Sequence, residues 1–127
     1  METLYKIGLL TVGGTLGTLA RYGLAGLVYR LLGSRFAWGT LAVNLIGCFL
    51  VGFAAALADE KFVLGPNVRL FFMVGFLGAF TTFSTYMLES INMLGQRDVA
   101  LALANVIGST VLGLVLVILG MGLARWL

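Results

Sequence analysis

The sequence has no histidine, and its 127 residues include only one cysteine and one proline. Without histidine there is no imidazole base and no histidine ligand for a metal ion. The single cysteine, Cys48, excludes a framework of disulfides within the chain. Paired carboxylates at a plausible site and a nucleophile–base motif are also missing. These absences predict that the protein is not an enzyme.

Charge is scarce as well. Charged residues make up 10% of the chain, eight basic and five acidic, while apolar residues make up 61%. Ordinary soluble domains contain about 25% charged residues, and a small domain must cover a large surface with polar groups. The mean hydropathy of +1.08 excludes a soluble monomer. The net charge of +3 is too small and too dispersed to indicate a nucleic-acid partner.

What the chain does contain is four long apolar segments, separated by short charged stretches. They are Ile7–Tyr29 with one charge, and Phe36–Ala58, Leu70–Leu88 and Val99–Ala124 with none. Helices of these lengths rise about 28–39 Å, which matches a hydrocarbon core of about 30 Å. The sequence therefore predicts an all-α membrane protein. We expect a single domain (1–127) with four transmembrane helices at about 4–31, 37–58, 68–94 and 99–125.

The basic residues are balanced between the two membrane faces. With four spans, one face carries Lys6, Lys61, Arg69 and Arg125, and the other carries Arg30, Arg35 and Arg97. Such a bias is negligible for the rule that cytoplasmic loops are positive. Two interpretations stay open at this point. The protein either has one weakly specified orientation, or inserts in both orientations and pairs as an antiparallel dimer.

Small and polar residues share helix faces in three of the spans. Gly13 and Gly17 fit a motif for close helix packing. Asn44 lies near the middle of the second span, and Asn105 and Ser109 lie one turn apart in the fourth. A side-chain amide in lipid is unfavourable unless it has a partner. These groups therefore either join helices or face a ligand or pore.

The third span contains the most unusual stretch, Gly75 to Tyr86 (GFLGAFTTFSTY). Its hydroxyl residues compete with helical hydrogen bonds, and its glycines weaken the helix further. We expect a break around Gly78–Ser84, although an intact helix with hydroxyl-to-backbone bonds is the alternative. A break exposes carbonyls that coordinate cations and amides that attract anions. Aromatic residues recur here, and their positive ring edges could favour a small anion; they are Phe76, Phe80, Phe83 and Tyr86.

Arg21 and Glu89 are the two charged residues that lie more than one turn inside a predicted span. Arg21 in the first span either extends to the interface or raises the local potential for anions. Glu89, near the end of the third span, either holds polar neighbours or exchanges protons. We favour a structural or electrostatic role for both.

Three motifs together resemble the Fluc (CrcB-type) fluoride channels. They are Gly13-Gly14-x-x-Gly17-x-x-x-Arg21-Tyr22, Gly39-Thr40-Leu41-x-Val43-Asn44-x-x-Gly47, and Gly75-Phe76-x-Gly78-x-x-Thr81-Thr82-Phe83-Ser84-Thr85. The resemblance covers nearly the whole chain in order. It implies a passive, fluoride-selective channel that exports fluoride across the inner membrane of a prokaryote. It also implies an antiparallel dual-topology homodimer with two pores and a structural sodium ion at its centre.

Roles for individual residues follow from the same resemblance. The carbonyls of Gly78 and Thr81 would hold the sodium ion, Asn44 would be the pore amide, and Phe83 would line the fluoride path with its ring edge. The remaining pore residues implied are Thr40, Thr82, Tyr86 and Ser109. The chain departs from the family pattern at Tyr86, where a second phenylalanine is usual. It also departs at Asn105 and Gly113, where some members carry an aromatic residue and a serine.

Two other function classes remain as alternatives. A small proton-coupled multidrug-type exporter needs a membrane-embedded carboxylate, for which Glu89 is the only candidate within a span. That family places its glutamate in the first span, where this chain has no acid. A structural subunit without transport would use the polar groups only to join helices.

Overall fold

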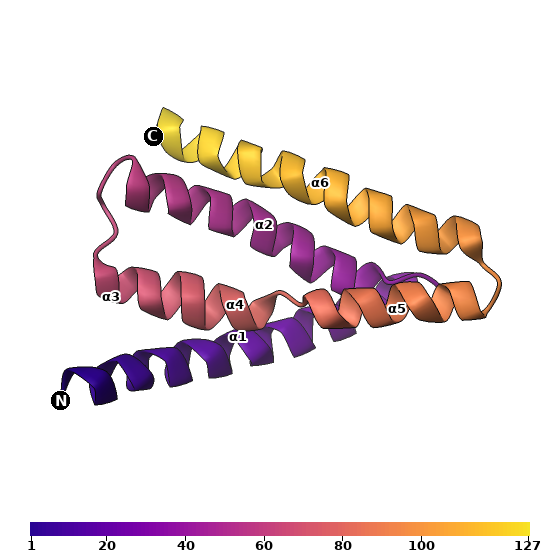
Figure 1. Cartoon of the computed structure of the whole chain (residues 1–127), viewed down its shortest axis with the longest axis horizontal. Coiled ribbons are helices and arrows are strands. Elements are labelled where there is room, and N and C mark those ends of the chain that lie inside the picture. Colours follow the sequence, from indigo (N-terminus) through magenta and orange to yellow (C-terminus); the bar gives the residue numbers. More distant parts are fainter.

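The computed structural model describes residues 1–127, and all of its regular secondary structure is helical. The long helices are α1 (Glu2–Leu32), α2 (Trp38–Asp59) and α6 (Val99–Trp126). Between α2 and α6 lies a composite helix made of α3 (Pro66–Val68), a π-helical segment η1 (Arg69–Leu77), α4 (Gly78–Phe80) and α5 (Phe83–Gly95). We call this stretch, Pro66–Gly95, the third span. Figure 1 shows the elements running roughly side by side, with both termini at the same end.

Local sequence explains where the helices begin and end. Gly33 ends α1 with a positive φ of 84°, a conformation that glycine adopts without a steric penalty. Pro66 begins α3 after the N-cap Gly65, because its missing N–H would have no partner in the first turn. Asp98 caps α6 by accepting a hydrogen bond from the Leu101 amide at 3.2 Å. The loops are short, so the helices stay close neighbours.

Three helical stretches are long and apolar enough to cross a membrane: Trp38–Asp59, Pro66–Gly95 and Val99–Trp126. This establishes a multi-pass membrane protein architecture without strands. α1 is not among the three, although it has 31 residues. It contains six glycines together with Glu2, Lys6, Arg21 and Arg30, which lower its hydropathy.

Glycines form two close helix interfaces. A Cβ at Gly17 would overlap the Phe76 carbonyl, and one at Gly13 would lie 2.5 Å from the Phe71 carbonyl, so α1 packs backbone to backbone against η1. In the same way, Gly52 of α2 lies against Val117, and Gly120 of α6 lies against Phe49. The glycine motif of the first segment is thus used for packing, as the small-residue rule predicts.

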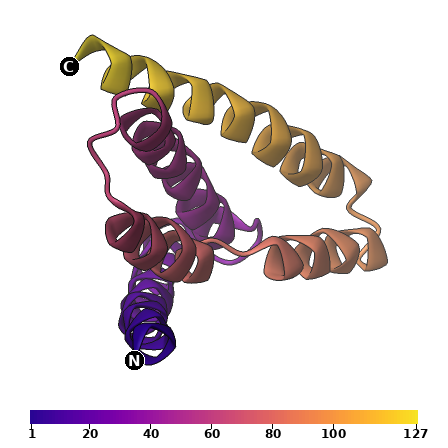
Figure 2. The ribbon, with the colours of Figure 1, turned by 60° about the vertical axis from the view of Figure 1, so that its left-hand side comes forward.

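The contacts also give the helix directions. The early part of α1 meets η1, and its later residue Tyr29 meets Glu89 of α5, so α1 runs parallel to the third span. α2 and α6 likewise run parallel to each other, from Ala37 beside Ala102 to Glu60 beside Arg125. α2 and α6 share the most extensive interface, and α1 with η1 the next. Figure 2 shows α5 and the start of α6 set apart from the other helices.

Candidate functional site

The third span is broken at two residues, within the region where the sequence predicts a break. Thr81 (φ −89°, ψ 159°) and Thr82 (φ −150°, ψ 115°) are extended between α4 and α5. The Thr81 hydroxyl turns back to the Leu77 carbonyl at 3.0 Å. Its methyl group packs on Gly47 of α2, where any Cβ would overlap it. The break therefore depends on α2 as much as on the third span itself.

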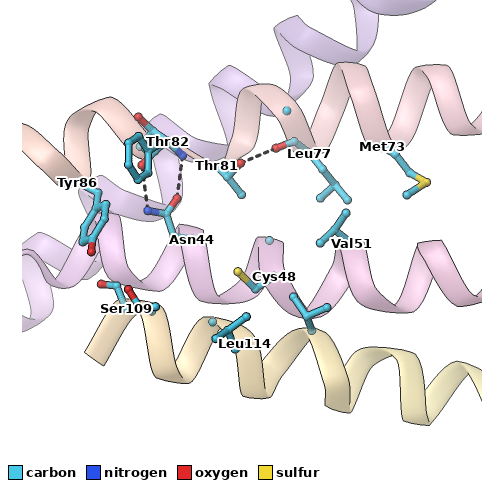
Figure 3. Close-up of a pocket in the computed structure, with 16 residues that line it drawn as sticks. Asn44, Cys48, Val51, Met73, Leu77, Thr81, Thr82, Tyr86, Ser109 and Leu114 are labelled. Atoms are coloured by element: carbon cyan, nitrogen blue, oxygen red, sulfur yellow. Dashed lines mark hydrogen bonds between the residues drawn. The ribbon is translucent and has the colours of Figure 1, made fainter. Parts of the chain in front are cut away.

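Asn44 of α2 pairs with the backbone of the break. Its Nδ2 donates to the Thr82 carbonyl at 3.0 Å, and its Oδ1 accepts from the Thr82 amide at 2.7 Å (Figure 3). The side-chain amide thus replaces the helical partners that Thr82 lacks, which a backbone at membrane depth requires. One N–H of the amide is still free, because each side-chain amide carries two. Asn44 can therefore join the helices and still donate to a ligand.

The break leaves carbonyls of the preceding turn without their helical amide partners, and those of Gly78 and Thr81 are two of them. The usual partner of the Gly78 carbonyl is the Thr82 amide, which bonds to Asn44 instead. The usual partner of the Thr81 carbonyl is the Thr85 amide, which bonds to the Thr82 hydroxyl at 3.3 Å. These are the two carbonyls singled out from the sequence. No group of His, Cys, Asp or Glu side chains comes together that could hold a metal ion.

A groove lies beside the break, between α2, the third span and α6, and encloses about 510 Å³. We call it the first cavity. Its lining includes seven of the residues predicted from the sequence: Asn44, Gly78, Thr81, Thr82, Phe83, Tyr86 and Ser109. Apolar side chains and Cys48, Thr110 and Gly113 line the rest (Figure 3). The structure therefore brings together residues from three helices that are far apart in sequence.

The break divides the aromatic residues into two groups. Phe76 and Phe80 stack before it, with ring centroids 5.7 Å apart, and Phe80 is buried. Phe83 and Tyr86 follow it and face the first cavity, with centroids 5.7 Å apart and planes tilted by 60°. Phe83 is 74% exposed, whereas Tyr86 is buried and donates its hydroxyl to the Val106 carbonyl at 3.2 Å. The hydroxyl that sets Tyr86 apart is thus bonded to α6.

A buried chain of hydrogen bonds continues from Tyr86 into α6. Asn105 is 1% exposed, and its Nδ2 donates to the Ser90 hydroxyl at 2.9 Å. Ser90 in turn donates to the Tyr86 carbonyl at 2.8 Å. On its other side Asn105 accepts a longer bond of 3.4 Å from Ser109. Asn105 therefore joins α5 to α6, while Ser109 keeps a weakly held hydroxyl at the wall of the first cavity.

Thr40 and Glu89 do not line the first cavity but meet each other one helical turn away. The Glu89 Oε1 accepts from the Thr40 hydroxyl at 2.9 Å and from the Tyr29 hydroxyl at 2.7 Å. The Glu89 Oε2 is buried without a partner. A second cavity of about 330 Å³ lies here, between the 33–37 loop and α5, and we call it the second cavity. Its lining includes Tyr29, Arg35 and Glu89.

The sequence predicts a structural or electrostatic role for Arg21, and in the structure Arg21 makes no hydrogen bond or ion pair within the chain. Sequence reasoning missed Tyr29, Ser90 and Arg35. Tyr29 lies in the last turn of α1 and Arg35 lies in the loop that follows, and nothing in the local pattern marks either of them. Only the packing of α1 against α5 reveals the contact of Tyr29 with Glu89.

The groups of the first cavity can hold an ion, but they include no general acid or base for covalent chemistry. Amide and hydroxyl donors surround the first cavity, and no acidic or basic side chain lines it. Donors of moderate strength can replace the hydration shell of an anion without trapping it.

Comparison with known proteins assigns the chain to a family. The family model described as "CrcB-like protein, Camphor Resistance (CrcB)" matches residues 8–121. A protein of Salinibacter ruber is 47% identical over 122 residues, covering 96% of this chain and 91% of the relative. A relative from Solidesulfovibrio magneticus is 43% identical, and the match covers 96% of this chain and 98% of the relative. A relative from Nitrosococcus oceani is also 43% identical, and the match covers 94% of this chain and 96% of the relative. All three relatives are named "Fluoride-specific ion channel FluC". From these matches, together with the resemblance carried by its three motifs, the chain belongs to the CrcB-like family.

Proposed function

We propose that this protein is a passive, fluoride-selective ion channel of the prokaryotic plasma membrane. The observation that carries the proposal is the first cavity, where Asn44, Thr82 and Ser109 place amide and hydroxyl groups beside the break. The names of the relatives supply the ion. Membership of this channel family makes the chain a membrane channel rather than an enzyme.

The physical requirements of fluoride agree with these groups. Fluoride is small and strongly hydrated, so several donors must replace its shell together. Asn44 has one N–H free, Ser109 is held by a bond of only 3.4 Å, and the exposed Phe83 ring can present its positive edge. No lysine or arginine lines the first cavity, so no fixed cation would hold the ion too tightly. Fluoride would leave the cell down its electrochemical gradient.

The proposed assembly is an antiparallel, dual-topology homodimer of four-span subunits with two pores. Three observations support it. α1 runs parallel to the third span, both termini lie at one end, and the basic residues are balanced between the ends. In addition, the Phe83 side chain is 74% exposed at the open side of the first cavity, where a second copy could cover it. Two copies would then complete two equivalent pathways.

A structural sodium ion at the dimer centre fits the backbone of the break. The carbonyls of Gly78 and Thr81 have lost their usual amide partners to Asn44 and to the Thr82 hydroxyl. Two such carbonyls from each of two copies would give four oxygen ligands, which suit a hard monovalent cation. The ion would fix the two breaks against each other. Asn44 contributes indirectly, because it withdraws the Thr82 amide from the Gly78 carbonyl.

Passive efflux from liposomes tests the channel directly. Vesicles with the purified protein are loaded with potassium fluoride or potassium chloride, valinomycin is added, and an ion-selective electrode records the released anion. We expect fast fluoride release with negligible chloride release, and slower release after Asn44→Ala or Phe83→Ala. A well-folded dimer that releases no fluoride would overturn the proposal.

The same preparation distinguishes the multidrug-type exporter. An exporter would exchange a cationic drug for protons and lose that exchange in Glu89→Gln, whereas a channel needs no proton gradient. Protein inert in both assays would favour a structural subunit.

A further inference from the structure

The second cavity holds an acid and a base that do not pair. Arg35 and Glu89 are its only charged lining residues, and they form no ion pair. Arg35 makes no hydrogen bond within the chain and is exposed. Opposite charges that share a cavity attract each other strongly at short range. Their separation therefore needs a structural cause.

The cause is the hydrogen bonding of Glu89 on the other side. Tyr29 and Thr40, from two different helices, both donate to its Oε1, at 2.7 and 2.9 Å. The Tyr29 ring packs directly on Gly39, where a Cβ would overlap it. In this position the Tyr29 hydroxyl points at the Glu89 carboxylate. The Glu89 Oε2 is buried without a hydrogen-bond partner, and neither carboxylate oxygen pairs with Arg35. The carboxylate is thus held against the inner wall of the second cavity.

The remaining lining of the second cavity suits an anion. Besides the free guanidinium of Arg35, the lining offers hydroxyl and amide donors from Ser34, Asn92 and Gln96. Short helical distances separate the two cavities: Glu89 of the second follows Tyr86 of the first by one turn of α5, and Thr40, which bonds to Glu89, precedes Asn44 by one turn of α2. An anion arriving from the membrane surface would meet Arg35 first and the donors of the first cavity afterwards.

We propose that the second cavity is a loading site for a small hydrated anion, with Arg35 as its positive charge. Tyr29 is the positioning residue that keeps Glu89 from neutralising Arg35. The inference rests on the proposed function, with fluoride as the anion. Without the Tyr29 hydroxyl, Thr40 is the one remaining donor to the carboxylate. The Glu89 side chain is then free to turn toward Arg35, and the two charges cancel where the anion arrives. The cavity then loses its attraction for fluoride while the pathway beyond it is unchanged.

The test compares efflux at low and at saturating fluoride, in a series of liposomes loaded with increasing concentrations. Tyr29→Phe keeps the ring on Gly39 but removes the hydroxyl, and Arg35→Gln removes the charge. We expect each to lower flux at low fluoride by about threefold to tenfold, with saturated flux kept within about twofold, because a charge at a mouth acts mainly on capture. High concentrations of an inert salt should reduce the difference.

Rescue separates positioning from a simple packing role. In Tyr29→Phe/Glu89→Gln no carboxylate remains to pair with Arg35, so flux at low fluoride should return to the wild-type level. The pair Tyr29→Phe/Arg35→Gln should be no weaker than Arg35→Gln alone. Matched controls are Tyr22→Phe, which removes a hydroxyl from the exposed side of α1, and Arg30→Gln, which removes a charge outside the second cavity. Both controls should behave as wild type.

Several outcomes would overturn the inference. Loss of flux at all concentrations in a folded Glu89→Gln protein would assign the carboxylate to conduction itself. An unchanged concentration dependence in Arg35→Gln would show that Arg35 does not load the anion. A Tyr29→Phe/Glu89→Gln protein as weak as Tyr29→Phe would show that Tyr29 does not act by positioning Glu89. Wild-type protein that conducts no fluoride would instead overturn the proposed function and this inference with it. Size-exclusion chromatography of each variant shows that a loss of flux is not a loss of folding.

Discussion

The two halves of the third span are held in place by different means. Before the break, η1 packs on α1 through Gly13 and Gly17, with backbone against backbone and few polar contacts. After the break, α5 is held by hydrogen bonds to the neighbouring helices, in which Tyr86 donates to Val106 while Glu89 and Ser90 accept from Tyr29 and Asn105. The first half has little room to move, while the second presents polar groups to two cavities. The difference suggests a fixed support for the break on one side and an adaptable, ion-facing wall on the other.

The largest effect should come from filling the glycine interface of the first half. Gly17→Ala places a Cβ on the Phe76 carbonyl, and neither backbone can give way, so we expect a loss of about 3 kcal/mol or failure to fold. Thermal unfolding in detergent measures it. Gly23→Ala is the control, because nothing lies within 4 Å of its Cβ, and alanine favours a helix. Equal stability of the two variants would contradict the close packing of this half.

A smaller effect is expected in the hydrogen-bonded half. Asn105→Leu leaves the buried Ser90 without its donor and Ser109 without its acceptor, for an expected loss of about 1–2 kcal/mol. The double variant Asn105→Leu/Ser90→Ala should recover part of this, because it removes both members of the buried pair. Thermal unfolding of the wild type, Asn105→Leu, Ser90→Ala and the double variant in one detergent gives the coupling. Strictly additive losses would show that the pair does not join α5 to α6.

Tyr86→Phe should have a still smaller effect. The variant deletes a 3.2 Å bond to the Val106 carbonyl, which also accepts a bond from Thr110 at 2.8 Å. We expect a loss below about 1 kcal/mol and fluoride flux within about threefold of wild type, because the ring edge is retained. A collapse of flux would instead mean that the Tyr86 hydroxyl donates to the ion. Liposome efflux decides between the two.

The smallest effect concerns an exposed contact outside both halves, at the end of the α2–α6 interface. Arg125 donates two hydrogen bonds to Glu60, at 2.6 and 2.7 Å, and these lower the pKa of that carboxyl group below its ordinary value of 4.5. The resulting stability is present above pH 4.5 and is lost as pH falls through the lowered pKa of the folded state. Glu60→Gln should therefore flatten the fall of the melting temperature slightly at acid pH. An identical pH profile would mean that the pair adds nothing, as is common for exposed pairs.

Much of the break could be predicted from the sequence. The cluster of glycine and hydroxyl residues gave its position, because these residue types weaken a helix wherever they occur. Asn44 was left with two possible roles, and its geometry is compatible with both, since one face of the amide meets Thr82 and one N–H is free. Local chemistry of this kind can be read from neighbours in the chain.

Other features could not be predicted in this way. The recurrence of aromatic residues from Phe76 to Tyr86 did not show that the extended residues Thr81 and Thr82 would divide them into a stacked pair before the break and a cavity-facing pair after it. The π-helical hydrogen bonding of η1 has no clear signature in residue type. Thr40 turned out to bond to Glu89 rather than to line the first cavity. These arrangements depend on how α1 and α2 cross the third span, which is information carried by tertiary packing.

The only thiol of the chain lies in the wall of the first cavity. Cys48 faces that groove from α2, opposite Gly113, where a Cβ would lie 3.3 Å from the sulfur. Because no second cysteine exists, a small thiol-directed label attaches there without any change to the natural sequence. The rate of its attachment, with and without fluoride, would report how far water reaches into the groove. The protein thus carries a built-in chemical probe at the place where an ion would lose its hydration shell.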